Sequence, residues 1–148
     1  MYLCDVNVLV NAFRPDAPEH ATSRSWLEGV LADESSYGVS EHVLSGFVRV
    51  VTHPKVFAQP DSFADALTFA DAVRGQPHAV LVRPGPGHWS IFCRLGRESD
   101  GRGDLVADAY LAALAIESGC EWVSFDRDFS RFRGLRWSHP RELLDRDA

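Results

Sequence analysis

Acidic residues interrupt or directly follow apolar segments at several points of this sequence. A carboxylate in such a place is costly unless it is paired or binds a cation. Several carboxylates held close together repel one another, and a divalent cation removes that conflict. Mg²⁺ prefers oxygen ligands and keeps several waters, so carboxylates without a nearby cysteine or histidine suit it. The acids that we assign to such a site are Asp5, Glu41, Asp108 and Asp126.

Two of these acids, Asp5 and Glu41, also have a purely structural explanation. Asp5 could be the N-cap of the helix that follows it. Glu41 comes directly after Ser40, and an acid in the first turn of a helix is ordinary helix chemistry. Asp126 comes directly after the strand 122–125, at its carboxyl end. Asp108 lies one turn inside an apolar helix, where no such explanation applies.

Further polar residues could support the site. Asp104 lies four residues before Asp108 on the same helix face, and it has an adequate explanation as an N-cap. Asp128 could cap a turn after Asp126, and Asn7 accompanies Asp5.

The elements that position these residues alternate between strands and helices, which predicts an α/β sandwich around a mostly parallel sheet. We treat residues 1–148 as one domain. In such folds ligands bind beyond the carboxyl ends of the strands, where the chosen acids would meet. Metal-assisted hydrolysis of a phosphodiester fits such a pocket. The predicted strands are 2–6, 36–40, 79–82, 122–125 and 135–137, and the predicted helices are 7–13, 19–31, 41–52, 63–73, 89–95 and 104–118.

Composition limits the classes of protein to consider. The net charge is −6, whereas nucleic-acid binders are usually basic, although a cluster of metal-binding carboxylates would contribute to that excess. No apolar run approaches the roughly 20 residues that cross a bilayer, and no basic region precedes the apolar start as in a signal peptide. The three cysteines have no CxxC spacing, so we expect no disulfide framework or zinc site, and a cytoplasmic location.

Three blocks resemble the signature motifs of VapC-type PIN-domain toxins in order and spacing. They are Asp5-Val6-Asn7-Val8-Leu9, the run from Asp108 to Ala115, and the run from Ser124 to Phe129. The stretch 47–57 is similar to a block found in one branch of that family, and the resemblance covers essentially the whole chain. It implies a PIN-like three-layer α/β/α sandwich and RNA cleavage that depends on Mg²⁺, with Mn²⁺ as a substitute. It also implies a VapB-type antitoxin partner, a homodimer, and metal ligands at Asp5, Asp108 and Asp126.

One position departs from the family pattern. Many PIN proteins carry a glutamate about six residues after the serine that ends the second strand, and here that position is Gly46. Glu41 is the nearest acid, and we assign it the catalytic role provisionally. The departure also supports an alternative, a PIN-fold module that binds RNA or protein without cleaving.

The residues that contact substrate cannot be identified from the pattern. A solvated surface charge is the simpler interpretation of each candidate cation, and core packing is the simpler interpretation of Trp89 and Trp137. A haloacid-dehalogenase-like phosphatase would need an aspartate at position 7, where this chain has Asn7. A response regulator would need a lysine after a strand. Both classes of protein are therefore excluded. The candidate cations are Arg14, Arg49, Lys55, Arg102, Arg127 and Arg131.

Overall fold

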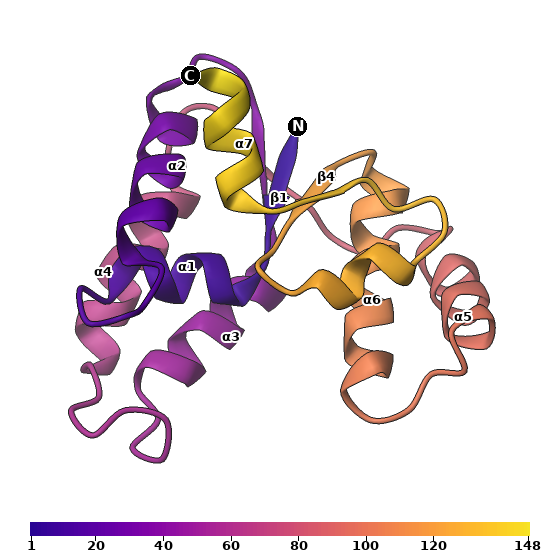
Figure 1. Ribbon diagram of the computed structural model, residues 1–148, viewed down its shortest axis with the longest axis horizontal. Coiled ribbons are helices and arrows are strands. Elements are labelled where there is room, and N and C mark those ends of the chain that lie inside the picture. Colours follow the sequence, from indigo (N-terminus) through magenta and orange to yellow (C-terminus); the bar gives the residue numbers. More distant parts are fainter.

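The computed structural model describes residues 1–148, and its strands form parallel ladders at the centre of the molecule (Figure 1). Strand β4 lies between β1 and β5 and pairs with both in parallel. A second parallel ladder joins β2 to β3. The strands are β1 (Tyr2–Cys4), β2 (Tyr37–Val39), β3 (Ala79–Leu81), β4 (Glu121–Val123) and β5 (Trp137–Ser138).

The two ladders lie side by side, as the contacts between β1 and β2 show. Gly38, in the middle of β2, makes this approach possible. A Cβ atom there would lie 3.2 Å from the backbone oxygen of Tyr2 and 3.1 Å from a methyl group of Val82. Any side chain at this position would therefore push the two ladders apart. Val6, which follows β1, also lies against Gly46 of the helix that follows β2, so the carboxyl ends of the two ladders share one edge.

Helices cover both faces of these strands, with α5 and α6 on one side and α1 to α4 on the other (Figure 1). This is the predicted three-layer α/β/α arrangement. All the predicted strands and helices are present, with small differences at their ends. The helices are α1 (Val6–Phe13), α2 (His20–Ala32), α3 (Glu41–Val51), α4 (Phe63–Arg74), α5 (His88–Glu98), α6 (Asp104–Ser118) and α7 (Pro140–Asp147), and a 3₁₀ helix, η1, spans Arg127–Arg131.

Three details differ from the sequence-based expectations. Helix α7 was not predicted, because Leu143 is its only fully buried leucine and so small an apolar face gives no helical pattern. Asp104 is not an N-cap, since Gly103 occupies that position and Asp104 is exposed in the first turn. The buried residues of helix α6 begin only at Ala109, and Val106 near its start is 40% exposed.

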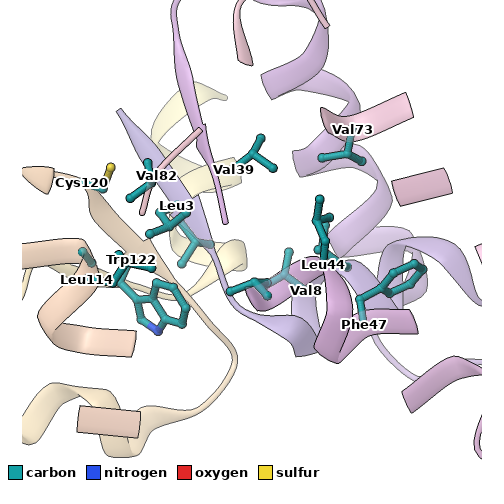
Figure 2. Packing of buried hydrophobic residues seen from close by; sticks show 14 of the residues in the cluster. Leu3, Val8, Val39, Leu44, Phe47, Val73, Val82, Leu114, Cys120 and Trp122 are labelled. Atoms are coloured by element: carbon teal, nitrogen blue, oxygen red, sulfur yellow. The ribbon is translucent and has the colours of Figure 1, made fainter. Parts of the chain in front are cut away.

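The hydrophobic core surrounds the central strands. Leu3 on β1 and Trp122 on β4 are almost completely buried, and Phe47 of α3 closes the core on the other side (Figure 2). The three cysteines are free thiols, and burial raises the pKa of Cys4 to about 12, so that thiol is protonated at neutral pH. No helix is both long and apolar enough to span a membrane.

Candidate active site

Asp5 stands at the junction between β1 and α1. Its backbone N–H donates to the carbonyl of Val123, which continues the β1–β4 ladder, and its side chain then caps α1 by accepting from the N–H of Val6 at 2.7 Å. The carboxylate is 9% exposed. Burial raises the pKa of Asp5, the hydrogen bond from Ser124 partly offsets this, and the charge of Asp126 adds to the rise. The helix cap and the buried acid are thus the same side chain.

Ser124 joins the carboxyl ends of β1 and β4. Its hydroxyl donates to Asp5 Oδ2 at 2.7 Å and accepts from the Asn7 amide at 3.1 Å and from the Asp126 N–H at 3.0 Å. A hydroxyl offers one donor and two acceptor positions, so all are in use. We did not single out this residue from the sequence. The available signal was a small polar residue inside the apolar run 122–125, where it is fully buried.

Asn7, on α1, links Asp5 to the loop that follows β4. Its amide nitrogen lies 3.4 Å from Asp5 Oδ2, and its side-chain oxygen accepts from the Phe125 N–H at 3.3 Å. Trp137 supports the same loop, because its indole N–H donates to the Ser124 carbonyl at 3.1 Å. Trp137 is therefore engaged in the scaffold, as we expected.

Asp126 and Asp128 follow β4 at the same edge. Asp126 caps the 3₁₀ helix by accepting from the Asp128 N–H at 2.9 Å. Asp128 is exposed and forms an ion pair with Arg131 at 3.3 Å. Asp126 thus fixes the conformation of the loop, and Asp128 carries an exposed charge beside it.

The pKa of Asp108 reflects the charges of the other acids at this edge of the sheet. It is half-buried on the second turn of α6, and its pKa is raised to about 6. Burial is the largest cause, and the charges of Asp126, Asp5, Asp104 and Asp128 follow. The three acids predicted to converge therefore share one electrostatic environment.

The donor chemistry of this cluster fits a hard divalent cation. The cluster offers carboxylate oxygens, and its members raise the pKa of Asp108 by repulsion, which a cation would relieve. No three or more aspartate, glutamate, histidine or cysteine side chains are arranged to hold a metal ion directly. Mg²⁺ binds in proteins through one or two carboxylates and keeps several waters, so it does not require such a closed cage.

Glu41 does not join the cluster. Its carboxylate lies 2.8 Å from Arg83 Nη2 and 3.2 Å from Arg74 Nη2. The hydrogen bond from Arg83 is the largest cause of its lowered pKa. Gly46 has no side chain and so supplies no acid in its place. A Cβ atom at this position would lie 2.9 Å from a methyl group of Val6. Helix α3 thus contributes no free carboxylate to this edge.

The candidate substrate contacts separate into distinct groups. Arg14 is buried and bonded to Asp16 at 2.6 Å and Asp61 at 2.8 Å, so it stabilises the fold. Trp89 is 68% exposed, which contradicts the expected core packing, because it lies on the outer face of α5. Arg102 and Arg131 pair with nearby aspartates, whereas the remaining cations are exposed, namely Arg49, Lys55 and Arg127.

The fold and the acidic edge place the chain among known proteins. Residues 2–135 match the PIN domain family. A VapC ribonuclease of Mycobacterium bovis, Mb2897, is 47% identical over 140 residues, which covers 95% of each chain. Ribonuclease VapC25 of Mycobacterium tuberculosis is 43% identical over 95% of this chain and 99% of its own. The chain therefore belongs to the PIN-domain family and, within it, to the VapC ribonucleases.

Solved structures show the same fold at much lower sequence identity. A chain of VapBC2 from Rickettsia felis, in a crystal with a promoter DNA fragment, superposes with a TM-score of 0.68 at 15% identity, over 93% of this chain and 97% of that one. VapC20 of Mycobacterium tuberculosis, a toxin that cleaves the sarcin–ricin loop, gives a TM-score of 0.64 at 18% identity, over 92% of this chain and 99% of that one. The predicted PIN fold and the resemblance to VapC-type toxins are both confirmed.

Proposed function

We propose that residues 1–148 form a single PIN domain that works as a Mg²⁺-dependent endoribonuclease toxin, with Mn²⁺ as an effective substitute. The observation that carries this proposal is the shared environment of Asp5, Asp108 and Asp126 at the carboxyl edge of the parallel sheet. Three carboxylates in mutual repulsion are costly to fold without a cation. Membership of the VapC ribonucleases supports RNA as the substrate.

The chain's own groups have distinct tasks in this mechanism. Asp5, Asp108 and Asp126 would hold the ion, one or two of them directly and the rest through its bound waters, and Asp104 and Asp128 would add negative charge around it. When bound, a divalent cation activates a water and neutralises phosphate oxygens. Ser124 and Asn7 fix the direction of Asp5 through the bonds at 2.7 and 3.4 Å. The fixed carboxylates would therefore hold the ion in one place at this edge of the sheet.

We also propose a VapB-type antitoxin as partner, a homodimer, and a cytoplasmic location. Family membership supports the antitoxin, and the free thiols fit a reducing compartment. Exposed apolar side chains such as Trp89, Val80 and Leu81 support burial against another chain. Light scattering of the purified protein should give twice the 16.4 kDa chain mass, and a monomer would contradict the dimer.

The function is tested by cleavage of RNA and by mapping new 5′ ends in bacteria that express the chain. The wild-type protein should cut RNA, EDTA should stop the cleavage, and added Mn²⁺ should restore it. Asp5→Asn should be inactive yet folded, because asparagine is also a good N-cap. Asp145→Asn, an exposed change on α7, is the matched control and should behave as wild type. Cleavage that continues unchanged in EDTA would overturn the metal mechanism.

A second function, binding without cleavage, is favoured by the ion-paired state of Glu41 and by the glycine at position 46. The same assay separates the two functions. A wild-type protein that binds RNA or antitoxin but leaves RNA intact in Mg²⁺ and Mn²⁺ would establish the binding module.

A further inference from the structure

Glu41 lies between two arginines that come from different elements. Arg83 follows β3 and donates to Glu41 Oε1 from Nη2 at 2.8 Å and from Nε at 3.3 Å. Arg74, in the last turn of α4, donates to Oε2 from Nε at 3.2 Å, and its Nη2 lies at the same distance. The carboxylate is thus bonded to the same edge of both guanidinium groups, and their Nη1 groups remain unbonded.

These three side chains lie on the edge that carries the acids. Glu41 comes two residues after β2, and Arg83 comes two residues after β3. Strand β1, which Asp5 follows, lies beside β2, as the contact between Gly38 and Tyr2 shows. Because β2 pairs with β3 and contacts β1, Arg83 lies two strands along the edge from the strand of Asp5.

The arrangement is poorly explained as a device for stability. Glu41, Arg74 and Arg83 are 46%, 42% and 65% exposed, and exposed ion pairs contribute at most about 1 kcal/mol. What the contacts do is hold two long side chains in fixed positions, which lowers the entropic cost of binding a ligand. Two guanidinium groups with free N–H donors suit a phosphate.

We propose that Arg74 and Arg83, held by Glu41, bind a phosphate of the RNA strand next to the one that is cleaved. This rests on the proposed function and gives Glu41 a positioning role in place of a metal-binding one. Asp71 lines a shallow groove together with Glu41 and Arg74, and its charge opposes an anion there. The RNA backbone then runs along the edge of the sheet from Arg83 toward Asp5.

Binding of a labelled single-stranded RNA should be measured in the inactive Asp5→Asn protein over a range of salt concentrations. Arg83→Gln and Arg74→Gln should each weaken binding about tenfold and flatten the slope of log K against log salt by about 0.7. Asp71→Asn should tighten binding. Arg24→Gln, which breaks a comparably exposed ion pair with Glu28 on α2, should change neither quantity.

A metal titration separates the two roles of Glu41. Glu41→Gln should leave Mn²⁺ affinity unchanged by electron paramagnetic resonance, whereas Asp108→Asn should abolish it. Equal loss in both variants would make Glu41 a metal ligand and overturn the proposal.

The outcomes also distinguish this inference from the function beneath it. A wild-type protein that neither binds nor cleaves RNA would remove the proposed function. Cleavage by the wild type, with Arg83→Gln indistinguishable from Arg24→Gln, would remove only the phosphate site. Normal RNA binding with lost antitoxin binding in Arg83→Gln would assign the surface to the protein partner instead.

Discussion

The hydroxyl of Ser124 donates a 2.7 Å hydrogen bond to the buried carboxylate of Asp5, from a residue 119 positions away in the sequence. The same oxygen accepts from the backbone N–H of Asp126. One neutral side chain therefore sets the positions of two acids that carry the same charge. It also lowers the pKa of Asp5 against the effect of burial.

Replacement of Ser124 by alanine should weaken metal binding and destabilise the fold. Asp5 Oδ2 would keep only the 3.4 Å contact with Asn7, and the Asp126 N–H would lose its acceptor. Buried polar groups without partners cost about 1–3 kcal/mol. Urea unfolding and Mn²⁺ titration measure the two effects. Ser118→Ala, which removes only bonds to two carbonyls within α6, is the control. Unchanged Mn²⁺ affinity would show that Ser124 does not orient the site.

Replacement of Asp108 by asparagine should stabilise the metal-free protein at pH 7 while it abolishes cleavage. The folded-state pKa of about 6 exceeds the ordinary value of 3.8, so the folded chain binds more protons than the unfolded chain between those values. Stability is therefore lost as pH rises from about 4 to 6. The gain should be about 1–2 kcal/mol, allowing for solvent screening of a half-buried group.

Urea unfolding in EDTA at pH 7 and pH 4 tests this expectation. The two proteins should differ at pH 7 and converge at pH 4, where the wild-type carboxyl is largely neutral. An asparagine variant that is less stable than wild type at pH 7 would contradict it.

Affinity for a divalent ion should fall in acid because Asp108 must lose its proton before it binds a cation. Since its pKa is raised to about 6, Mn²⁺ affinity should rise by up to about tenfold per pH unit below that value and level off above it. Calorimetry over pH 5–8 is the measurement. Asp104→Asn should move the midpoint to lower pH, because the charge of Asp104 contributes to the rise. A flat profile would show that Asp108 is not a ligand.

Replacement of Arg14 by methionine should loosen the segment that joins α3 to α4. The buried guanidinium bonds Asp16, Asp61 and the Gln59 carbonyl, and it lies 3.8 Å from the centre of the Phe57 ring. Loss of these charged hydrogen bonds, which a buried guanidinium makes to partly exposed carboxylates, should cost about 2–3 kcal/mol. Hydrogen exchange should accelerate at residues 53–61, and Arg24→Met on α2 should leave it unchanged. No acceleration would mean that the segment is held by other contacts.

The sequence was sufficient to predict that Asp5, Asp108 and Asp126 would lie near one edge of the sheet, where the charges of Asp5 and Asp126 raise the pKa of Asp108. The reason is geometric, since parallel strands deliver their carboxyl ends to one edge and each acid follows or faces such an end. The apolar residues around Asp108 made its charge conspicuous. The same reasoning predicted the sandwich, because strands and helices alternate with short connections.

The environment of Glu41 could not be predicted in this way. Its partners, Arg74 and Arg83, belong to two other elements, and only the packing of α4 and β3 against the start of α3 brings them together. The spacing of the three residues in the sequence does not indicate this packing. Ser124 was missed for a related reason, because a buried hydroxyl is recognised by its partners rather than by its position in a run.

The order of the strands also determines when the acidic edge can exist. Strand β1 is synthesised first, yet its ladder partner β4 begins only at Glu121. Asp5 and Asp126 therefore cannot come together until most of the polypeptide has been translated. A ribosome that makes this chain therefore completes nearly the whole product before the acidic edge can assemble, and a nascent chain that stops before Glu121 has neither β4 nor Asp126.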